Sequence, residues 1–161
     1  MDTSSTLMGV GMLLIFIAPV AIYLMRQSSN KKSNRKHLIL LAKQHNLKLS
    51  KIDFLPNLSL GLDEASGKLL VRYSGKENKN RCIDLNSYSS SVIAKSYSSN
   101  GSEPNNFDNI SQISLRLKQN GKTSEEEDLI FFEKDRTSVL QKEEMMHAAE
   151  KWNDWIEKLL K

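Results

Sequence analysis

The sequence predicts an α+β chain in which one N-terminal transmembrane helix is followed by a seven-stranded antiparallel barrel or sheet, closed by a C-terminal amphipathic helix. Three observations predict this fold class. An uncharged apolar run near the N-terminus is long enough to cross a bilayer. Short apolar runs separated by turn residues then indicate an antiparallel sheet. The end of the chain has apolar side chains at helical spacing.

The predicted anchor runs from Leu7 to Met25 without a charged residue, and a helix of this length reaches about 28 Å. The alternative is a cleaved secretory signal, but the first six residues contain no Lys or Arg and the run does not end in a small-residue cleavage site. Basic residues flank only its C-terminal side, which places the N-terminus outside and the rest of the chain in the cytoplasm, at the inner (plasma) membrane. These flanking residues are Arg26, Lys31, Lys32, Arg35 and Lys36.

Three regions follow from this pattern: a short tail and anchor at 1–25, a basic linker with a juxtamembrane helix at 26–46, and a soluble domain at 47–161. Within the linker, Leu38, Leu41 and Ala42 recur at helical spacing, so we expect a short helix from His37 that ends near Asn46. A chain of 161 residues leaves enough for a single folded domain after the anchor.

The soluble domain shows short apolar runs, among which Ile113, Leu115 and Leu117 alternate most clearly with polar neighbours. A turn is expected at 65–67, between the second and third strands. The helix expected at 142–160 carries an apolar stripe that includes Trp152 and needs a sheet to cover it. The strands are expected near 48–54, 59–63, 68–73, 81–84, 91–97, 111–119 and 128–134.

Charge and cysteine content exclude several classes of function. The chain has 23 basic and 19 acidic residues, but the excess lies beside the anchor, and from His37 onward the two signs balance. A nucleic-acid-binding domain needs a basic face, so we expect no nucleic-acid partner. The single cysteine, Cys82, permits no intramolecular disulfide, and we expect it to be a small buried hydrophobe on a strand.

No motif indicates an active site, a cofactor or a metal. The histidines are scattered, and the acidic run 125–128 is interpreted as solvated charge in a loop. The serine-rich stretch 87–99 lacks a nucleophile motif, so a non-enzymatic protein is expected. The loop 55–57 between the first two strands has no basic residue, which argues against recognition of a lipid headgroup.

The chain resembles a group of uncharacterised single-pass membrane-anchored proteins of Bacteroidota with a pleckstrin-homology-like soluble domain. The segments that carry the resemblance are LAKQHNLKLSKIDF, LGLDEASGKLLVRY, RCIDLNSYSSSVIAKSY, ISLRLKQ, LIFFEKD and AEKWNDWIEKL, which together cover most of the soluble part. The resemblance implies seven strands before one closing helix. It also implies that Trp152 packs onto the barrel, as a tryptophan of the closing helix does in pleckstrin-homology domains. It implies no activity.

Together these observations favour a membrane-tethered, non-enzymatic interaction module that binds an unknown protein partner at the inner membrane face. The candidate site is an edge strand for an extended peptide, at Ser91, Ile93, Lys95 and Tyr97, chosen because its outward residues are expected to be polar. One alternative is an accessory or structural subunit of a membrane complex, contacted through the anchor. The third is a lipid-headgroup sensor or an unrecognised enzyme.

Overall fold

The computed structural model describes residues 34–74, 79–98, 107–119, 126–135 and 137–160. The predicted anchor and the flanking residues Arg26, Lys31 and Lys32 lie outside these ranges, whereas Arg35 and Lys36 lie in a helix at 34–44. None of the helices within the described ranges combines the length and the apolar character that crossing a membrane requires.

Seven strands form two antiparallel sheets, in the orders β1-β2-β3-β4 and β5-β6-β7, and are followed by helix α2 (Lys142–Leu159). This confirms the predicted order of elements. Among the described residues no strand pairing joins the two sheets, so they do not close into a barrel. The strands are β1 (Lys51–Phe54), β2 (Leu58–Asp63), β3 (Lys68–Tyr73), β4 (Asn80–Asp84), β5 (Tyr88–Tyr97), β6 (Ile110–Gln119) and β7 (Glu126–Glu133).

Two strands begin at positions that differ from the prediction and have side-chain contacts at these positions, whereas β5 begins three residues earlier than expected, at Tyr88, directly after a short helix at 85–87. β1 begins three residues later than expected, since the Lys48 backbone N–H donates to the Asp63 carboxylate at 2.8 Å. β7 begins two residues earlier, because Glu126 and Glu127 pair with arginines of β6 and β4. The acidic run is therefore part of a strand within the described residues, and the interpretation of 126–128 as a solvated loop was wrong.

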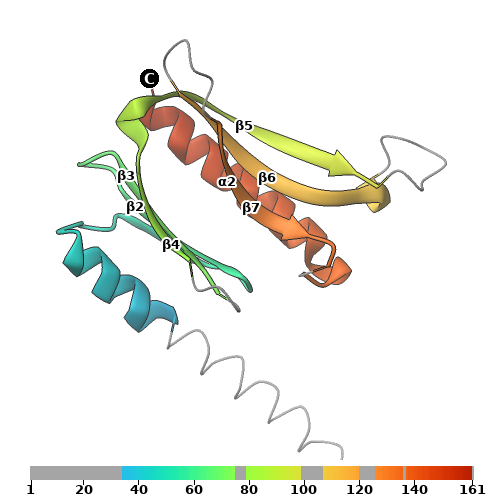
Figure 1. Cartoon of the computed structure of the whole chain (residues 1–161), viewed down its shortest axis with the longest axis horizontal. Coiled ribbons are helices and arrows are strands. Elements are labelled where there is room, and N and C mark those ends of the chain that lie inside the picture. Colours follow the sequence, from blue (N-terminus) through green and yellow to red (C-terminus); the bar gives the residue numbers. More distant parts are fainter. Residues whose placement is uncertain (1–33, 75–78, 99–106, 120–125, 136, 161) are drawn as a thin grey trace, which may run out of the picture.

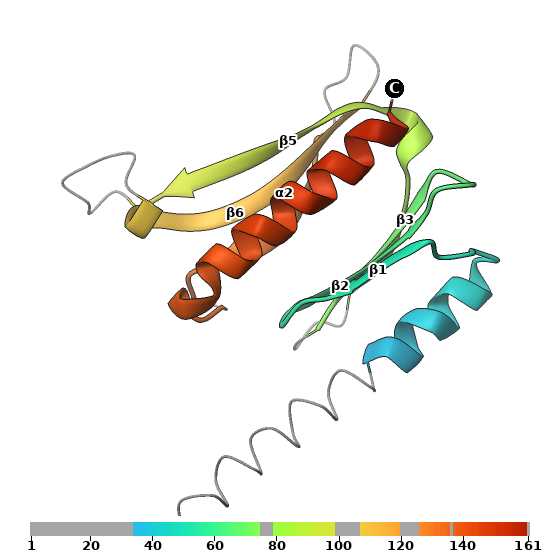
Figure 2. The same cartoon turned by 180° about the vertical axis from the view of Figure 1, so that it is seen from behind.

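The two sheets diverge from the corner where the short helix η1 (Leu85–Ser87) joins β4 to β5, and α2 lies between them (Figures 1 and 2). One hydrophobic core includes residues from both sheets and from α2. Trp152 is fully buried there, as expected, and its ring meets that of Trp155 edge to face with centroids 5.1 Å apart. Helix α2 thus fills the space between two sheets that do not join.

The helix at 34–44 covers the other face of the four-stranded sheet. Leu38 and Ala42 form a second, smaller apolar cluster with Leu47 and with Leu70 of β3. The helix ends at position 44, and Asn46, two residues later, has a positive φ of 53°, the left-handed conformation common just after a helix C-terminus. The order of layers is therefore helix 34–44, four-stranded sheet, α2 and three-stranded sheet.

Cys82 is exposed, so the prediction of a buried residue was wrong. In the β3–β4 register Leu69 pairs with Ile83, which faces the main core, and Leu70 pairs with Cys82 on the opposite face. Helix 34–44 covers Leu70 but leaves Cys82 on the edge strand in contact with solvent. Alternation with the buried Ile83 places Cys82 on the outer face of the sheet.

Candidate protein-binding edge

β5 is an outer strand of the three-stranded sheet, and within the described part of the chain it pairs only with β6 (Figure 1). It spans ten residues, which makes its unpaired edge a long one. The backbone N–H and C=O groups along such an edge are available to pair with another extended chain.

The four residues predicted for this site do not share one environment. Ser91 is only 2% exposed, and its hydroxyl donates a hydrogen bond to Asn153 Oδ1 of α2 at 2.9 Å. Ile93 packs against the main core, whereas Lys95 and Tyr97 are exposed. The expectation that the outward side chains are polar holds for Lys95, Ser96 and Tyr97, but Ser91 faces the helix and the apolar Val92 is 45% exposed. The accessible side chains of this set are thus Lys95 and Tyr97, and alternation places Val92 on the opposite face of the strand from Lys95.

The end of β5 is held in place through Lys142, a buried residue at the start of α2. Its ammonium group donates to the backbone carbonyls of Phe107 and Asp108 at 3.1 and 2.9 Å, and lies 5.5 and 5.6 Å from the ring centroids of Phe107 and Phe132. These carbonyls belong to the short helix η2 (Phe107–Asn109). The backbone carbonyl of Asn109 in the same helix accepts a hydrogen bond from the backbone N–H of Ser98, directly after β5. A positive charge in the first turn of a helix is unfavourable, because it lies beside the positive end of the helix dipole. The position of Lys142 is therefore a signal in the sequence that groups outside the helix bind this side chain.

The opposite flank of α2 contacts β1 through Asp53. The Asp53 carboxylate accepts hydrogen bonds from the Lys151 ammonium and from Trp152 Nε1, the latter at 3.3 Å. The ammonium groups of Lys51 and Lys151 lie 5.5 and 5.3 Å from the Trp155 ring centroid. Helix α2 is therefore fixed to both sheets, which gives β5 a rigid support. The sequence placed Trp152 on the buried stripe but did not indicate Asp53 as its partner.

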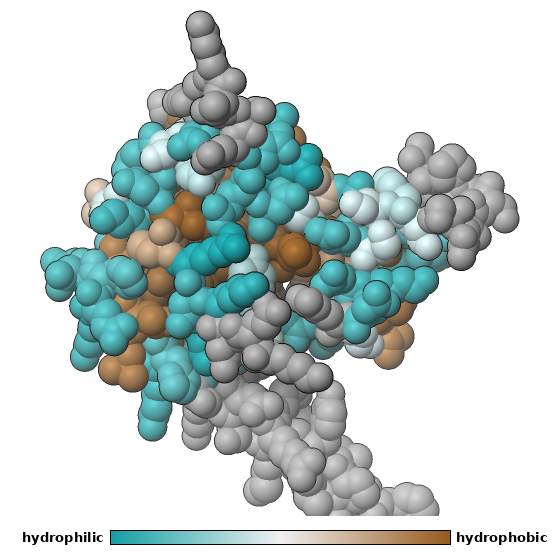
Figure 3. Space-filling model, in the orientation of Figure 1, coloured by the Kyte–Doolittle hydropathy of each residue, from teal (hydrophilic) through white to brown (hydrophobic). Residues whose placement is uncertain are grey.

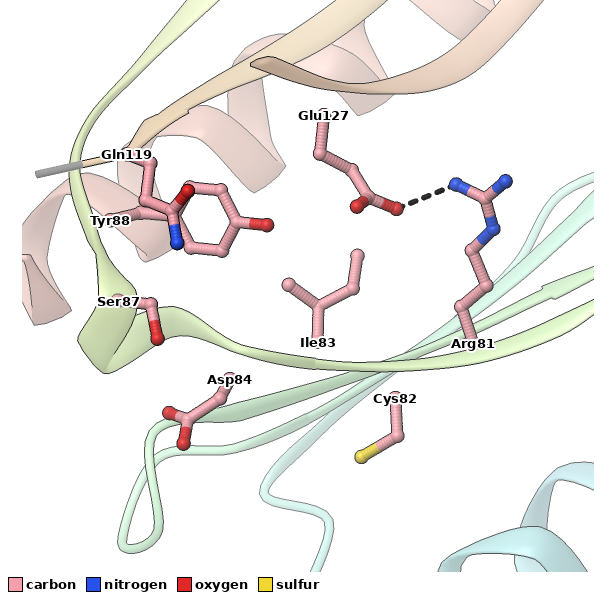
Figure 4. Close-up of a pocket in the computed structure, with 8 residues that line it drawn as sticks. All are labelled: Arg81, Cys82, Ile83, Asp84, Ser87, Tyr88, Gln119 and Glu127. Atoms are coloured by element: carbon pink, nitrogen blue, oxygen red, sulfur yellow. Dashed lines mark hydrogen bonds and ion pairs between the residues drawn. The ribbon is translucent and has the colours of Figure 1, made fainter. Parts of the chain in front are cut away.

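A shallow cavity of about 390 Å³ lies where β4 and η1 meet the ends of the three-stranded sheet. Figure 4 shows Arg81 and Glu127 pointing toward each other across it, with Ile83 below them and Tyr88 and Gln119 at the other end. Cys82 and Asp84 point to the opposite side of β4. The cavity is therefore an open recess between an ion pair and a tyrosine.

The chemistry of this recess does not favour catalysis or anion binding. The Arg81 guanidinium donates to Glu127 at 2.7 Å, and this bond raises the pKa of Arg81, so its charge is already balanced. Partial desolvation raises the pKa of the Cys82 thiol, which disfavours the nucleophilic thiolate at neutral pH. None of the lining residues is a histidine or a lysine that would act as a base beside Ser87.

Within the described ranges, no group of three or more His, Cys, Asp or Glu side chains is placed to hold a metal ion. Two carboxylates of the acidic run form ion pairs with one guanidinium: Arg116 lies 3.1 Å from Glu126 and 2.8 Å from Asp128.

Comparison with known proteins yields no relative, because no family model, no curated protein and no solved structure matches this chain.

Proposed function

We propose that this chain is a membrane-tethered, non-enzymatic interaction module whose β5 edge binds an extended segment of a protein partner as an added strand. The proposal includes the anchor from Leu7 to Met25 in the inner membrane, a cytoplasmic soluble domain and a pleckstrin-homology-like arrangement of its seven strands and closing helix. Tethering raises the local concentration of such a module, so modest affinity for the partner suffices.

The observation that carries the proposal is the lack of protection along β5 compared with the other outer strands. Proteins shield sheet edges with charge, proline or short length. β7 has four acidic residues among its eight, and β1 is only four residues long. β5 has ten residues, no proline and a single charge, at Lys95, and its two register irregularities lie near its ends, at Tyr88/Ser90 and Ser96/Tyr97, so the stretch 91–95 between them is regular. An unprotected edge either risks aggregation by pairing with other chains or serves as a binding surface. The hydrogen bond from Ser91 of β5 to Asn153 of α2 holds the strand in place and favours a binding surface.

A photo-crosslinking amino acid in the full-length protein tests the site. We expect one protein to be captured from positions 95 and 97 and not from position 144, an exposed control site on α2. Hydrogen exchange with that partner bound must then slow in the amides of 88–97, because strand addition forms new backbone hydrogen bonds. Equal capture at position 144, or unchanged exchange in β5, would contradict binding by strand addition.

Replacement of residues 7–25 with an unrelated membrane helix separates this proposal from the accessory-subunit alternative. Retention of the same partner supports binding through the domain. Loss of the partner, with the domain still folded and membrane-bound, would instead assign the contact to the anchor.

A further inference from the structure

The helix at 34–44 presents two different faces to its surroundings. Leu38, Leu41 and Ala42 face the four-stranded sheet. Lys36, Ile39, Leu40 and Lys43 follow the spacing i, i+3, i+4, i+7 and form a second stripe along the helix, which we call the outer stripe. All four outer-stripe residues are exposed, with Ile39 at 37% and Leu40 at 57%.

The surroundings of the outer stripe are positively charged. Residues 34–50 contain four basic and no acidic side chains, and within the described residues neither Lys36 nor Lys43 forms an ion pair. The part of the molecule beyond the four-stranded sheet has the opposite balance, because the three-stranded sheet and α2, at 88–98, 107–119, 126–135 and 137–160, contain eleven acidic and seven basic side chains. The helix is thus the positive end of the domain.

Adjacent aliphatic side chains between lysines match one kind of surface best. An anionic bilayer attracts the lysines through its headgroups and accepts the two aliphatic side chains at the acyl boundary. Nucleic acid would make favourable contacts with the lysines alone, because its phosphates form no apolar contact with Ile39 and Leu40. Figure 3 shows brown apolar atoms among teal hydrophilic ones on the side of the molecule where this helix lies.

We propose that the outer stripe docks on the anionic surface of the membrane that holds the anchor. This inference rests on the membrane anchor of the proposed function. Eight residues separate position 25 from position 34, and at about 3.5 Å each they reach at most about 28 Å, so the helix begins close to the lipid headgroups. Docking through this stripe turns the four-stranded sheet toward the bilayer and the three-stranded sheet with its β5 edge away from it.

Spin labels on the full-length protein test the orientation. In a Cys82→Ser background, single cysteines at positions 14, 39, 40 and 92 carry a nitroxide, and the protein is inserted in nanodiscs of phosphatidylcholine with phosphatidylglycerol. Collision rates with oxygen and with a water-soluble nickel chelate report whether each label lies in lipid or in water. We expect lipid contact at 14, 39 and 40, and water at 92 on β5.

Each failure has its own meaning. Labels 39 and 40 in water with label 14 in lipid would overturn the docking proposal alone, whereas label 14 in water would overturn the anchor and with it the proposed function. As a charge test, Lys36→Gln with Lys43→Gln is expected to lower the lipid-contact equilibrium about 25-fold, at about fivefold per lysine. The matched control is Lys134→Gln with Lys158→Gln, two exposed lysines that form no ion pair among the described residues, and it leaves labels 39 and 40 in lipid. Equal loss in both pairs would contradict a specific role of the outer stripe.

Discussion

Asp53 joins a short edge strand to the closing helix. Its carboxylate accepts from Trp152 Nε1, from the Lys151 ammonium and, at 3.2 Å, from the Phe54 backbone N–H. The indole N–H belongs to a fully buried side chain, and the Asp53 carboxylate is the acceptor that satisfies it in the folded protein. An unsatisfied buried donor costs about 1–3 kcal/mol.

We therefore expect Asp53→Ala to lower the free energy of unfolding by about 1–3 kcal/mol, measured by denaturant titration with tryptophan fluorescence. Lys151→Ala removes the half-exposed ion-pair partner and its contact with the Trp155 ring but leaves the bond to Trp152, and it is expected to cost less than about 1 kcal/mol. If both variants lose the same stability, the contact with Trp152 contributes nothing beyond the ion pair.

Asp63 gives the stability a defined dependence on pH. The backbone N–H of Lys48 donates to its carboxylate and lowers its pKa, which burial opposes, and the N–H groups of Ser66 and Ala65 lower it further. A group whose pKa is lower in the folded state stabilises the fold above its unfolded value, about 3.9 for Asp, and this contribution disappears as the pH falls through the folded value. The gap in melting temperature between the wild type and Asp63→Asn should thus be open at pH 7 and narrow toward pH 3. A gap that stays constant over this range would exclude Asp63 as its source.

The helix at 34–44 belongs to the packed domain although the sequence suggested only a linker helix. Leu38 is fully buried against the sheet, while Leu40, two residues later, is mostly exposed. A leucine truncated in a core costs about 2–5 kcal/mol, but a surface substitution stays within about 0.5 kcal/mol. We expect this difference between Leu38→Ala and Leu40→Ala in chemical denaturation. Equal and small effects would show that the helix does not contribute to the stability of the sheet.

The elements were predictable from the sequence where a single local pattern determines them. Alternation at Ile113, Leu115 and Leu117 located β6, and helical spacing around Trp152 located α2. The spacing of residues along the chain does not show which distant segment packs against an element. Both faces of β2 are buried, because Leu49 after the helix lies against Gly61 on one face and the main core covers the other. No pattern within β2 itself indicates which residues cover it.

The candidate site was predictable in part for the same reason. The strand order places β5 at an edge, and a run of short strands in sequence order indicates which strands can lie outermost. The environment of each β5 side chain depends on α2, which the chain reaches more than 40 residues later. For this reason the sequence alone predicts an outward-facing Ser91, although its hydroxyl is hydrogen-bonded to Asn153 of α2.

At the scale of the whole molecule, two apolar clusters of unequal size lie on opposite faces of the four-stranded sheet. The larger contains both sheets and α2, and the smaller contains Leu38, Ala42, Leu47 and Leu70. Segments with few buried apolar contacts open at a lower free energy than the global unfolding of the protein. We therefore expect helix 34–44 to open more readily than α2, which supports β5.

Hydrogen exchange on the full-length protein in nanodiscs measures this difference and its dependence on lipid. In phosphatidylcholine alone we expect the amides of 34–44 to exchange at least about tenfold faster than those of α2, for an opening free energy about 1.4 kcal/mol smaller. Because the outer stripe gains contacts only with an anionic surface, added phosphatidylglycerol should slow exchange in 34–44 and leave α2 unchanged. Slowing in both elements would mean that the lipid stabilises the whole fold, and no slowing in either would mean that the helix does not meet the bilayer. Slowing confined to 34–44 would show that the membrane acts on one face of the domain while the edge of β5, on the other side of α2, remains open to a partner.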